Sequence, residues 1–217
     1  MLTTAEAQAG EAHLQWVSYP TAKRVMDVVV SALVLVAVIP LWVVVAVAIR
    51  LDSPGPVLFV QERIGFKGKR FRCFKFRTMQ VDAEARLAEM RRRGEVEGPV
   101  YKLRRDPRVT RVGRLLRRTS LDELPQLLNV LRGEMSLVGP RPCIPEHVEQ
   151  FRPDDLVRLD TRPGLTCLWV VREGRSDCTL EGWMAADRDY VSRQSLTLDA
   201  WILLKTIFVV LSCRGAY

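Results

Sequence analysis

The feature that most constrains the fold of this chain is an uncharged run at residues 28–49, in which only Ser31 and Pro40 interrupt the apolar side chains. As a straight helix rising 1.5 Å per residue, the run would be ~33 Å long, enough to cross a hydrocarbon core of about 30 Å. A buried core helix of this kind does not fit a chain of 217 residues, which has room for one ordinary domain and an appendage. The run therefore predicts contact with a membrane.

Pro40 makes a straight crossing less favourable than a bend. Proline lacks the backbone N–H of the helical hydrogen bond, so we expect a break just before it. Both flanks of the run are basic, with Lys23 and Arg24 before it and Arg50 directly after it. Because basic residues near membrane ends favour the cytoplasmic side, a re-entrant hairpin that bends at Pro40 satisfies this rule at both ends. Two alternatives stay open, namely a single straight span and a signal peptide cleaved after the small residues at 46–48.

Positive charge is concentrated directly after this run. The chain has a formal net charge of +8, and residues 50–118 alone contain 20 Lys and Arg against 8 Asp and Glu. Such a block attracts nucleic acid, anionic lipid headgroups or phosphorylated small molecules by the same electrostatics. The composition therefore indicates an anionic partner without saying which one.

Cysteine and histidine usage limits the chemistry. The five cysteines include no C-x-x-C pair and cannot all be bridged internally, which favours a reducing compartment. The two histidines, His13 and His147, lie in no zinc-binding pattern. We therefore expect carboxylates to do any acid, base or nucleophile work.

Hydrophobic periodicity and breaker residues predict the remaining elements. Two short strands are expected at residues 57–60 and 71–76. Helices are expected at residues 81–93, 108–118, 122–132, 180–192 and 196–213. The last of these is nearly all apolar, so it would either lie on a bilayer or dock on the core.

Asp122 and Glu123 are adjacent carboxylates at the predicted start of the helix at residues 122–132. Ser120 and Glu123 match a capping box, which would account for Glu123 by itself. Capping leaves Asp122 unexplained. Beside a helix N-terminus and two arginines, its pKa is expected to be depressed, and it would stay ionised as a metal ligand or covalent nucleophile requires.

Several basic residues occupy stiff backbone settings. Arg141 lies between two prolines, Arg162 precedes Pro-Gly, and Lys75 and Arg77 alternate with phenylalanines on a predicted strand. Restricted backbones pre-organise such cations for phosphate. Beside an acid able to bind Mg²⁺ they indicate phosphoryl transfer, although neither a P-loop nor a Rossmann glycine motif is present.

Five longer motifs, in this order, resemble the bacterial sugar transferases, which are monotopic polyprenyl-phosphate phosphoglycosyl transferases. They are KFRTM at residues 75–79, DPRVTRVG at 106–113, RRTSLDELPQLLN at 117–129, GEMSLVGPRP at 133–142 and RPGLT at 162–166.

The resemblance implies a two-step reaction. Asp122 would attack the β-phosphorus of a UDP-sugar and release UMP, and undecaprenyl phosphate would then take the phosphosugar from the enzyme. Glu123 would complete the catalytic Asp-Glu dyad, and Mg²⁺ would be the cofactor, held near Asp122. The residues expected to bind phosphate or substrate are Lys75, Arg77, Arg117, Arg141 and Arg162.

The resemblance also implies an α+β, mostly helical fold, with a re-entrant membrane helix-break-helix and a small catalytic domain of short strands and interfacial amphipathic helices. The expected division is an N-terminal segment at 1–22, a membrane hairpin at 23–51 and a catalytic domain at 52–217, which includes the interfacial C-terminal helix. The expected location is the cytoplasmic face of a bacterial inner membrane, in the first membrane step of exopolysaccharide, capsule or O-antigen-type synthesis.

The expected partners are a UDP-sugar, undecaprenyl phosphate and anionic lipids, with no nucleic acid, and a homo-oligomer is left open. Ile39 stands where relatives often have a serine that can satisfy the broken helix, and the run CLWVV at residues 167–171 departs from the usual pattern, so the sugar is not specified. The alternative is a membrane-tethered basic binding module without catalysis.

Overall fold

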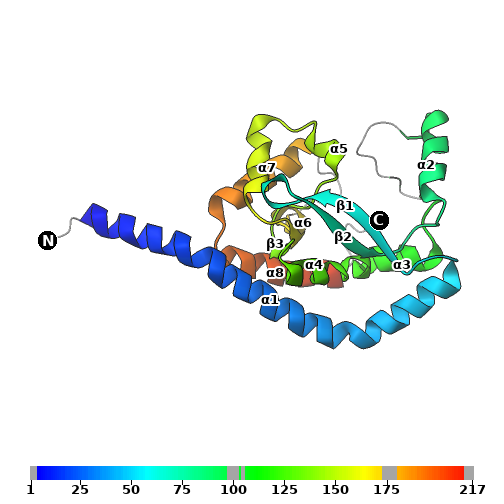
Figure 1. The fold of residues 1–217 in the computed structure, drawn as a ribbon, viewed down its shortest axis with the longest axis horizontal. Helices are drawn as coiled ribbons and strands as arrows, with labels where there is room; N and C mark the ends of the chain where they lie inside the picture. Colours follow the sequence, from blue (N-terminus) through cyan, green and yellow to red (C-terminus); the bar gives the residue numbers. More distant parts are fainter. Residues whose placement is uncertain (1–3, 97–102, 104–105, 173–179, 213–217) are drawn as a thin grey trace.

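The computed structural model describes residues 4–96, 103, 106–172 and 180–212. A long N-terminal helix, α1 (Thr4–Asp52), runs along one side of a small domain (Figure 1). The described residues are mostly helical, with two small two-stranded sheets. The expectation of a mostly helical chain with short strands and one long apolar helix is thus confirmed.

The first sheet is an antiparallel hairpin of β1 (Leu58–Ile64) and β2 (Arg70–Phe76), joined through the short 3-10 turn η1 (Phe66–Gly68). The second pairs β3 (Ser136–Val138) in parallel with β4 (Gly164–Thr166). The helical elements that complete the domain are α2 (Ala83–Arg92), α3 (Arg111–Thr119), η2 (Leu121–Glu123), α4 (Gln126–Arg132), α5 (Pro145–Val148), η3 (Pro153–Asp160), α6 (Leu168–Val171), α7 (Leu180–Arg193) and α8 (Leu196–Leu211).

Two helix predictions need correction. The helix expected at 108–118 begins only at Arg111, because Thr110 caps it by accepting a hydrogen bond from the N–H of Gly113 at 2.9 Å. The helix expected at 122–132 begins only at Gln126, and Asp122 and Glu123 belong to the separate turn η2, which follows Ser120 where its left-handed conformation, with φ of 56°, ends α3. The other predicted elements are confirmed within a few residues, except that residue 213 at the end of the last one lies outside the described residues.

The main core lies between α4, the β3–β4 pair, α7 and α8. Its fully buried side chains include Val130, Met135, Val138, Tyr190 and Ile202, each 0–1% exposed. These residues come from segments far apart in the sequence, so the core holds the loops after β3 and before β4 against the C-terminal helices.

The part of α1 just before the apolar run docks on this core through the polar side chains of Lys23 and Asp27. Lys23 forms a buried ion pair with Asp199 of α8, with 2.7 Å between Nζ and Oδ2. Asp27, which is 2% exposed, accepts hydrogen bonds from the Ser136 hydroxyl at 3.1 Å and the Leu137 N–H at 3.0 Å. Lys23, one of the basic flanks in the sequence, therefore ties the helix to the domain and is not a free headgroup-binding charge.

The C-terminal part of α1 docks on the same domain through apolar contacts. Val45 and Ile49 are 5% and 2% exposed and form a second core cluster with Phe76 and Leu116. Asp52 accepts a hydrogen bond from the N–H of Val112 at 2.9 Å. Both ends of the apolar run are therefore held by one globular domain.

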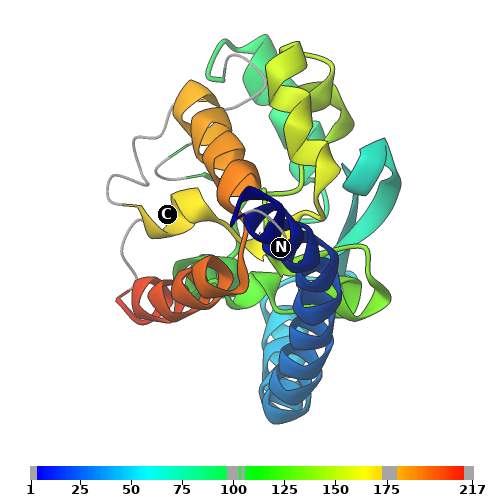
Figure 2. The ribbon, with the colours of Figure 1, turned by 90° about the vertical axis from the view of Figure 1, so that its left-hand side faces the viewer.

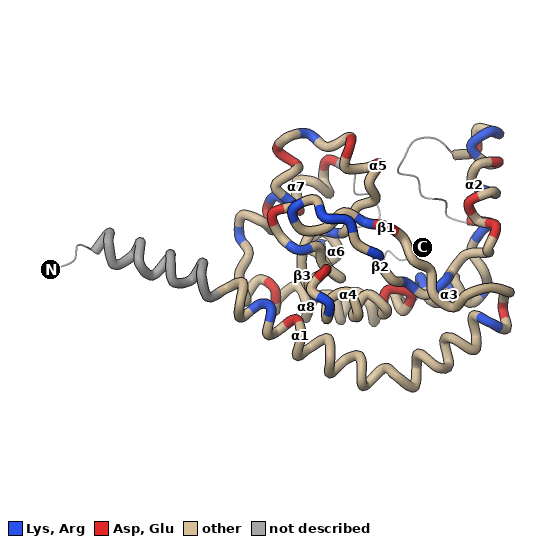
Figure 3. Tube along the Cα trace, viewed as in Figure 1, with Lys and Arg blue, Asp and Glu red and all other residues tan. Residues whose placement is uncertain are grey.

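The middle of α1 projects away from the domain in both ribbon views (Figures 1 and 2). It carries no charged residue (Figure 3). Its outward side chains are more than half exposed, including Leu33, Val36, Val43, Val44 and Val47. The segment Tyr19–Asp52 is long and apolar enough to cross a membrane, and only 11% of its most apolar window is buried in the protein.

The predicted break at Pro40 is not confirmed as an interruption. The helical assignment of α1 continues through Pro20 and Pro40, although the axis of the helix changes direction along its length (Figure 1). A proline-induced bend without loss of the helix is a common outcome.

Candidate active site

The two adjacent carboxylates lie in η2, the short 3-10 turn between α3 and α4. The left-handed residue Ser120 turns the chain sharply at the end of α3. The N–H of Glu123 then bonds to the Ser120 carbonyl at 3.2 Å, which closes the turn. As a result Asp122 and Glu123 lie on a tight corner and not on the first turn of a regular helix.

Glu123 is clamped between two cations. Its Oε1 accepts from Lys75 Nζ at 2.8 Å and from an Arg141 Nη at 2.6 Å. The capping-box interpretation is therefore wrong, because the Glu123 carboxylate reaches β2 and the loop after β3 and not the backbone of its own turn. Burial alone would raise the pKa of Glu123, but the charges of Arg141 and Lys75 outweigh it and hold that pKa well below its usual range.

Asp122 has the opposite electrostatic situation. Burial, followed by the negative charge of Glu123, raises the pKa of Asp122 to about 6, although Lys75, Arg117 and Arg141 pull it down. The sequence-based expectation of a depressed pKa is wrong, because burial, followed by the charge of Glu123, outweighs the nearby cations, two of which are already bonded to Glu123. Among the described residues, Asp122 accepts no hydrogen bond and forms no ion pair, so its carboxylate is available to a ligand.

Three predicted phosphate ligands therefore lie around the dyad. Lys75 is contributed by β2, where it pairs in register with Phe59 of β1. Arg141 comes from the loop after β3, and Arg117 from the last turn of α3. Arg117 Nε donates to Thr78 Oγ1 at 2.9 Å, and its charge acts on Asp122. Lys75, Arg117 and Arg141 thus place positive charge around Asp122, whose carboxylate has no hydrogen-bond or ion-pair partner among the described residues.

The other two predicted ligands lie elsewhere. Arg77 is 6% exposed, and its Nη atoms donate to the carbonyls of Ser53 at 2.8 Å and Pro54 at 2.5 Å, after the end of α1. Because β2 ends at Phe76, the alternation that would place Arg77 beside Lys75 stops one residue too early. Arg162 Nε donates to the Gly133 carbonyl at 2.9 Å. These positions give no support to a phosphate role for Arg77 or Arg162, and both roles stay predictions.

Close backbone packing brings the two proline-containing loops together. A Cβ on Gly139 would lie 2.3 Å from the Arg162 carbonyl oxygen, and one on Gly164 would lie 2.1 Å from the Gly139 nitrogen. Only glycine permits this approach. The loop that carries Arg141 is therefore packed directly on the loop that begins at Arg162.

A Mg²⁺ ion in this place would have a limited set of protein ligands. Among the described residues there is no group of three or more acidic, Cys or His side chains placed to hold a metal. Both Glu123 oxygens face cations, whereas Asp122 is available. Mg²⁺ is commonly bound by one or two carboxylates together with substrate phosphates, and Asp122 suits that mode.

Reasoning from the sequence missed two residues that shape the site. Asn129 is fully buried and joins α4 to β2, because its side chain accepts from the Phe74 N–H at 3.1 Å and donates to the Arg72 carbonyl at 2.7 Å. Arg158 is 3% exposed and bonds to the Arg141 carbonyl at 2.6 Å. Asn129 lay inside a recognised motif, whereas nothing in the local sequence around Arg158 distinguishes it from a surface charge.

A carboxylate pair surrounded by cations, in a domain docked on an exposed apolar helix, is typical of an enzyme that handles anionic substrates at a membrane. The chain belongs to the bacterial sugar transferase family, whose model matches residues 18–213.

Three relatives illustrate the family. An exopolysaccharide production protein ExoY from Sinorhizobium fredii is 42% identical over 90% of this chain and 88% of its own length. A UDP-glucose:undecaprenyl-phosphate glucose-1-phosphate transferase from Caulobacter vibrioides is 44% identical over 90% of this chain and 72% of its own length. An undecaprenyl-phosphate galactose phosphotransferase from Salmonella typhimurium is 42% identical over 90% of this chain and 41% of its own length.

Proposed function

We propose that this protein transfers a sugar 1-phosphate from a UDP-sugar to undecaprenyl phosphate, by way of a phosphosugar covalently bound to Asp122. The products are UMP and undecaprenyl-diphosphate-sugar. The observation that carries this proposal is the contrast between two neighbours: Glu123 is clamped by Lys75 and Arg141, whereas Asp122 has no such partner in the part of the chain that the structure describes. The names of the relatives supply the two substrates.

In the first step an Asp122 oxygen attacks the β-phosphorus of the UDP-sugar. The new oxygen–phosphorus bond forms as the bond from the β-phosphorus to the oxygen bridging it to the α-phosphorus breaks, and that oxygen leaves with UMP. A nucleophilic carboxylate must be ionised, and a pKa of about 6 leaves Asp122 mostly ionised at neutral pH. Lys75, Arg117 and Arg141 would hold the phosphate oxygens, as expected of a reaction that depends on positioning and charge neutralisation.

In the second step an oxygen of undecaprenyl phosphate attacks the same phosphorus. The bond to Asp122 breaks, and the carboxylate is restored. Glu123 would act in both steps by keeping Lys75 and Arg141 in place around the reacting phosphate, because both cations are already bonded to it. Mg²⁺, held by Asp122 and the substrate phosphates, would supply additional neutralisation of the diphosphate charge.

The lipid substrate requires a site at a membrane surface, and the shape of α1 supports a re-entrant anchor. Lys23 and Asp27, just before the apolar run, and Ile49, at its end, all contact the same domain. A straight span would place these contacts on opposite faces of the bilayer. We propose that the projecting middle of α1 enters the bilayer, bends near Pro40 and returns.

The C-terminal helix supports the same orientation. The outward side chains Leu204, Ile207, Phe208 and Leu211 of α8 are 55–76% exposed. α8 lies toward the same end of the domain as the projecting part of α1 (Figures 1 and 2). A helix with an apolar exposed face is suited to lie in the membrane interface. Placement at the cytoplasmic face of the inner membrane, where anionic lipids contact the basic domain, belongs to this proposal.

The central test is Asp122→Asn in the full chain reconstituted in lipid nanodiscs. We expect UMP release from a panel of UDP-sugars with undecaprenyl phosphate to fall to background, because an amide cannot accept the phosphosugar. Asp154→Asn, which removes an exposed carboxylate, is the matched control. Intact-mass measurement of the parent protein, quenched after UDP-sugar alone, should show the phosphosugar adduct. Full turnover by Asp122→Asn would refute the proposal.

Two further measurements test the cofactor and the topology. EDTA should abolish turnover and added Mg²⁺ should restore it, whereas activity that persists without divalent metal would remove Mg²⁺ from the mechanism. For topology, Gly10→Cys and Lys69→Cys should react with a membrane-impermeant maleimide from the same side. Labelling from opposite sides would establish a straight span.

The rival function is a membrane-tethered module that binds anions without chemistry. It predicts that no UDP-sugar is consumed and that affinity for nucleic acid or anionic lipid falls steeply with salt. It gives no role to Asp122. The UDP-sugar panel therefore separates the two functions and also identifies the sugar.

A further inference from the structure

Arg158 of η3 is a buried cation outside the carboxylate dyad, and its surroundings are unusual for an arginine. It is 3% exposed, and its guanidinium lies over the rings of Phe151, at 5.1 Å, and Trp183, at 5.4 Å. Removing a charged group from water costs several kcal/mol unless its hydrogen bonds are replaced. The buried guanidinium of Arg158 therefore requires hydrogen-bond acceptors within the protein.

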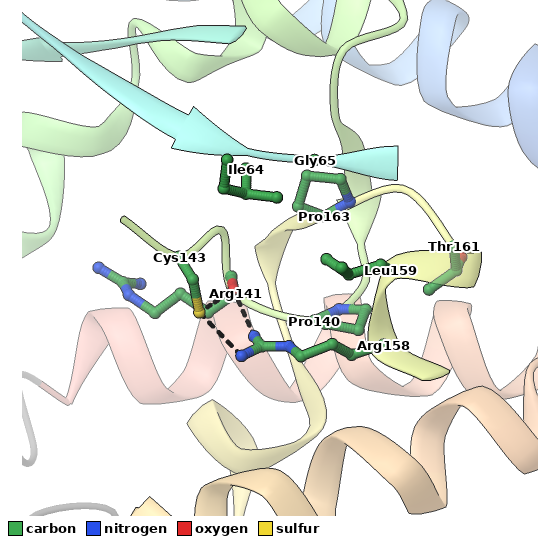
Figure 4. Close-up of a pocket in the computed structure, with 9 residues that line it drawn as sticks. All are labelled: Ile64, Gly65, Pro140, Arg141, Cys143, Arg158, Leu159, Thr161 and Pro163. Atoms are coloured by element: carbon green, nitrogen blue, oxygen red, sulfur yellow. Dashed lines mark hydrogen bonds between the residues drawn. The ribbon is translucent and has the colours of Figure 1, made fainter. Parts of the chain in front are cut away.

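Those partners lie in the loop that carries Arg141. One Nη atom of Arg158 donates to the Arg141 carbonyl at 2.6 Å, and the other lies 2.8 Å from Cys143 Sγ (Figure 4). The guanidinium thus bonds two positions of the loop at once, on either side of Pro142. The side chain of Arg141 extends away from this contact in Figure 4 and bonds to Glu123.

The negative partner of Arg158 does not account for this geometry. Asp187 Oδ2 lies 2.9 Å from an Arg158 Nη, yet this oxygen makes no aligned hydrogen bond among the described residues. Burial raises the pKa of Asp187 to about 7 in spite of the Arg158 charge. Asp187 is therefore the ion-pair partner, while the hydrogen bonds of Arg158 go to Arg141 and Cys143 of the loop and to Met184 Sδ of α7, at 3.7 Å.

The cavity that Arg158 lines is too small for a substrate. The cavity lined by Arg158, Arg141 and Cys143 has a volume of about 10 Å³, which is at most the space of one water molecule. Any effect of Arg158 on a reaction at Asp122 must therefore pass through the loop.

We infer that Arg158 is a positioning residue that holds the Arg141 backbone, so that the Arg141 guanidinium meets both Glu123 and the substrate phosphate. This inference rests on the proposed function. A displacement of about 1 Å in a group that orients a substrate can cost on the order of 100-fold in rate. Loss of the two loop contacts should lower kcat by about 10- to 100-fold, with KM for the UDP-sugar changed by less than about threefold, since the lost interaction is realised in the transition state.

The test is a double-mutant cycle on the full chain in nanodiscs, with UMP release as the assay. Arg158→Met should show the loss of kcat, and in an Arg141→Ala background it should lower kcat by less than about twofold, because residues that act as one unit are not additive. A merely structural role would instead give the full additional loss in that background, and this outcome would overturn the inference.

Two variants keep the test valid if Arg158→Met unfolds. Asp187→Asn removes the charge partner but leaves both loop contacts, so kcat should stay within about threefold of the parent even where the melting temperature falls. Arg158→Lys keeps a charge beside Asp187 but cannot bond both loop positions, so kcat should still fall. Equal effects of Asp187→Asn and Arg158→Lys on kcat would overturn the inference.

The outcomes also separate this inference from the proposed function. Normal turnover by Arg141→Ala, or no consumption of any UDP-sugar by the parent protein, would overturn the proposed function and this inference with it. A defective Arg141→Ala together with a fully active Arg158→Lys would overturn the positioning role alone.

Discussion

Replacing Glu123 by glutamine should move the pH dependence of catalysis in a direction that only the observed electrostatics predict. After burial, the negative charge of Glu123 is the largest influence that raises the pKa of Asp122. Glutamine removes this charge and also leaves Lys75 and Arg141 less neutralised. Both effects favour the ionised form of Asp122, so its pKa should fall.

The size of the change follows from the two limiting values. The pKa of Asp122 is about 6 in the folded protein, against an ordinary value of 3.8. At pH 5 a carboxyl of pKa 6 is about one-tenth ionised, and one of pKa between 4 and 5 is about half to nine-tenths ionised. If the ionised form is the nucleophile, the activity of Glu123→Gln at pH 5, relative to its own plateau, should rise about fivefold or more over that of the parent.

The assay is kcat/KM for UMP release between pH 4.5 and 8, with each profile normalised to its plateau because loss of the clamp will lower the plateau itself. This ratio reports ionisation of the free enzyme. Glu146→Gln, which neutralises an exposed carboxylate, should leave the acid limb unchanged. An acid limb that stays at about pH 6 in Glu123→Gln, or moves to higher pH, would refute the assignment of the limb to Asp122.

Three other predictions concern stability, burial and the membrane. Asp199→Asn leaves Lys23 buried without its counter-charge and should cost about 3–5 kcal/mol, seen as a lower melting temperature in nanodiscs; a loss as small as that of Arg70→Met, at an exposed pair, would contradict this. Burial raises the pKa of Cys167 to about 12, so iodoacetamide at pH 8 should leave Cys167 unmodified until the protein is unfolded, and rapid alkylation in the native state would contradict its burial. Phe208 is 68% exposed on α8, and if α8 lies in the membrane interface, Phe208→Glu removes about 1.5–3 kcal/mol of apolar burial in the membrane. Binding of this variant to vesicles should therefore weaken by about tenfold or more. Unchanged binding would place α8 outside the membrane.

Local patterns in the sequence were sufficient for most of the secondary structure. The hairpin strands around Lys75, the helix ended at Gly94 and the two C-terminal helices follow from periodicity and from breaker residues that act over a few positions. The expected run at 108–118 failed at its start, because Thr110 caps the helix and Val109 pairs with Met79 instead. Which of several adjacent residues begins a helix depends on such contacts, and periodicity does not contain them.

The candidate site was only partly predictable. The sequence identified Asp122, Glu123 and the cations Lys75 and Arg141, and the tertiary structure brings them together. Arg77 was predicted for the same group but is bonded to the carbonyls after α1, because β2 ends one residue earlier. The alternation of side chains between the two faces of a sheet predicts their directions only within the strand.

By itself, the sequence determined that this chain has an apolar segment suited to a membrane, a basic domain after it and the motifs of a sugar transferase, because composition and motif spacing are properties of neighbouring residues. The tertiary structure decided the rest. The partners of Glu123 lie 48 and 18 positions away along the chain, and the burial that raises the pKa of Asp122 comes from packing between several elements. Charge and burial act through space, so their balance at a single carboxylate is settled only when distant segments meet.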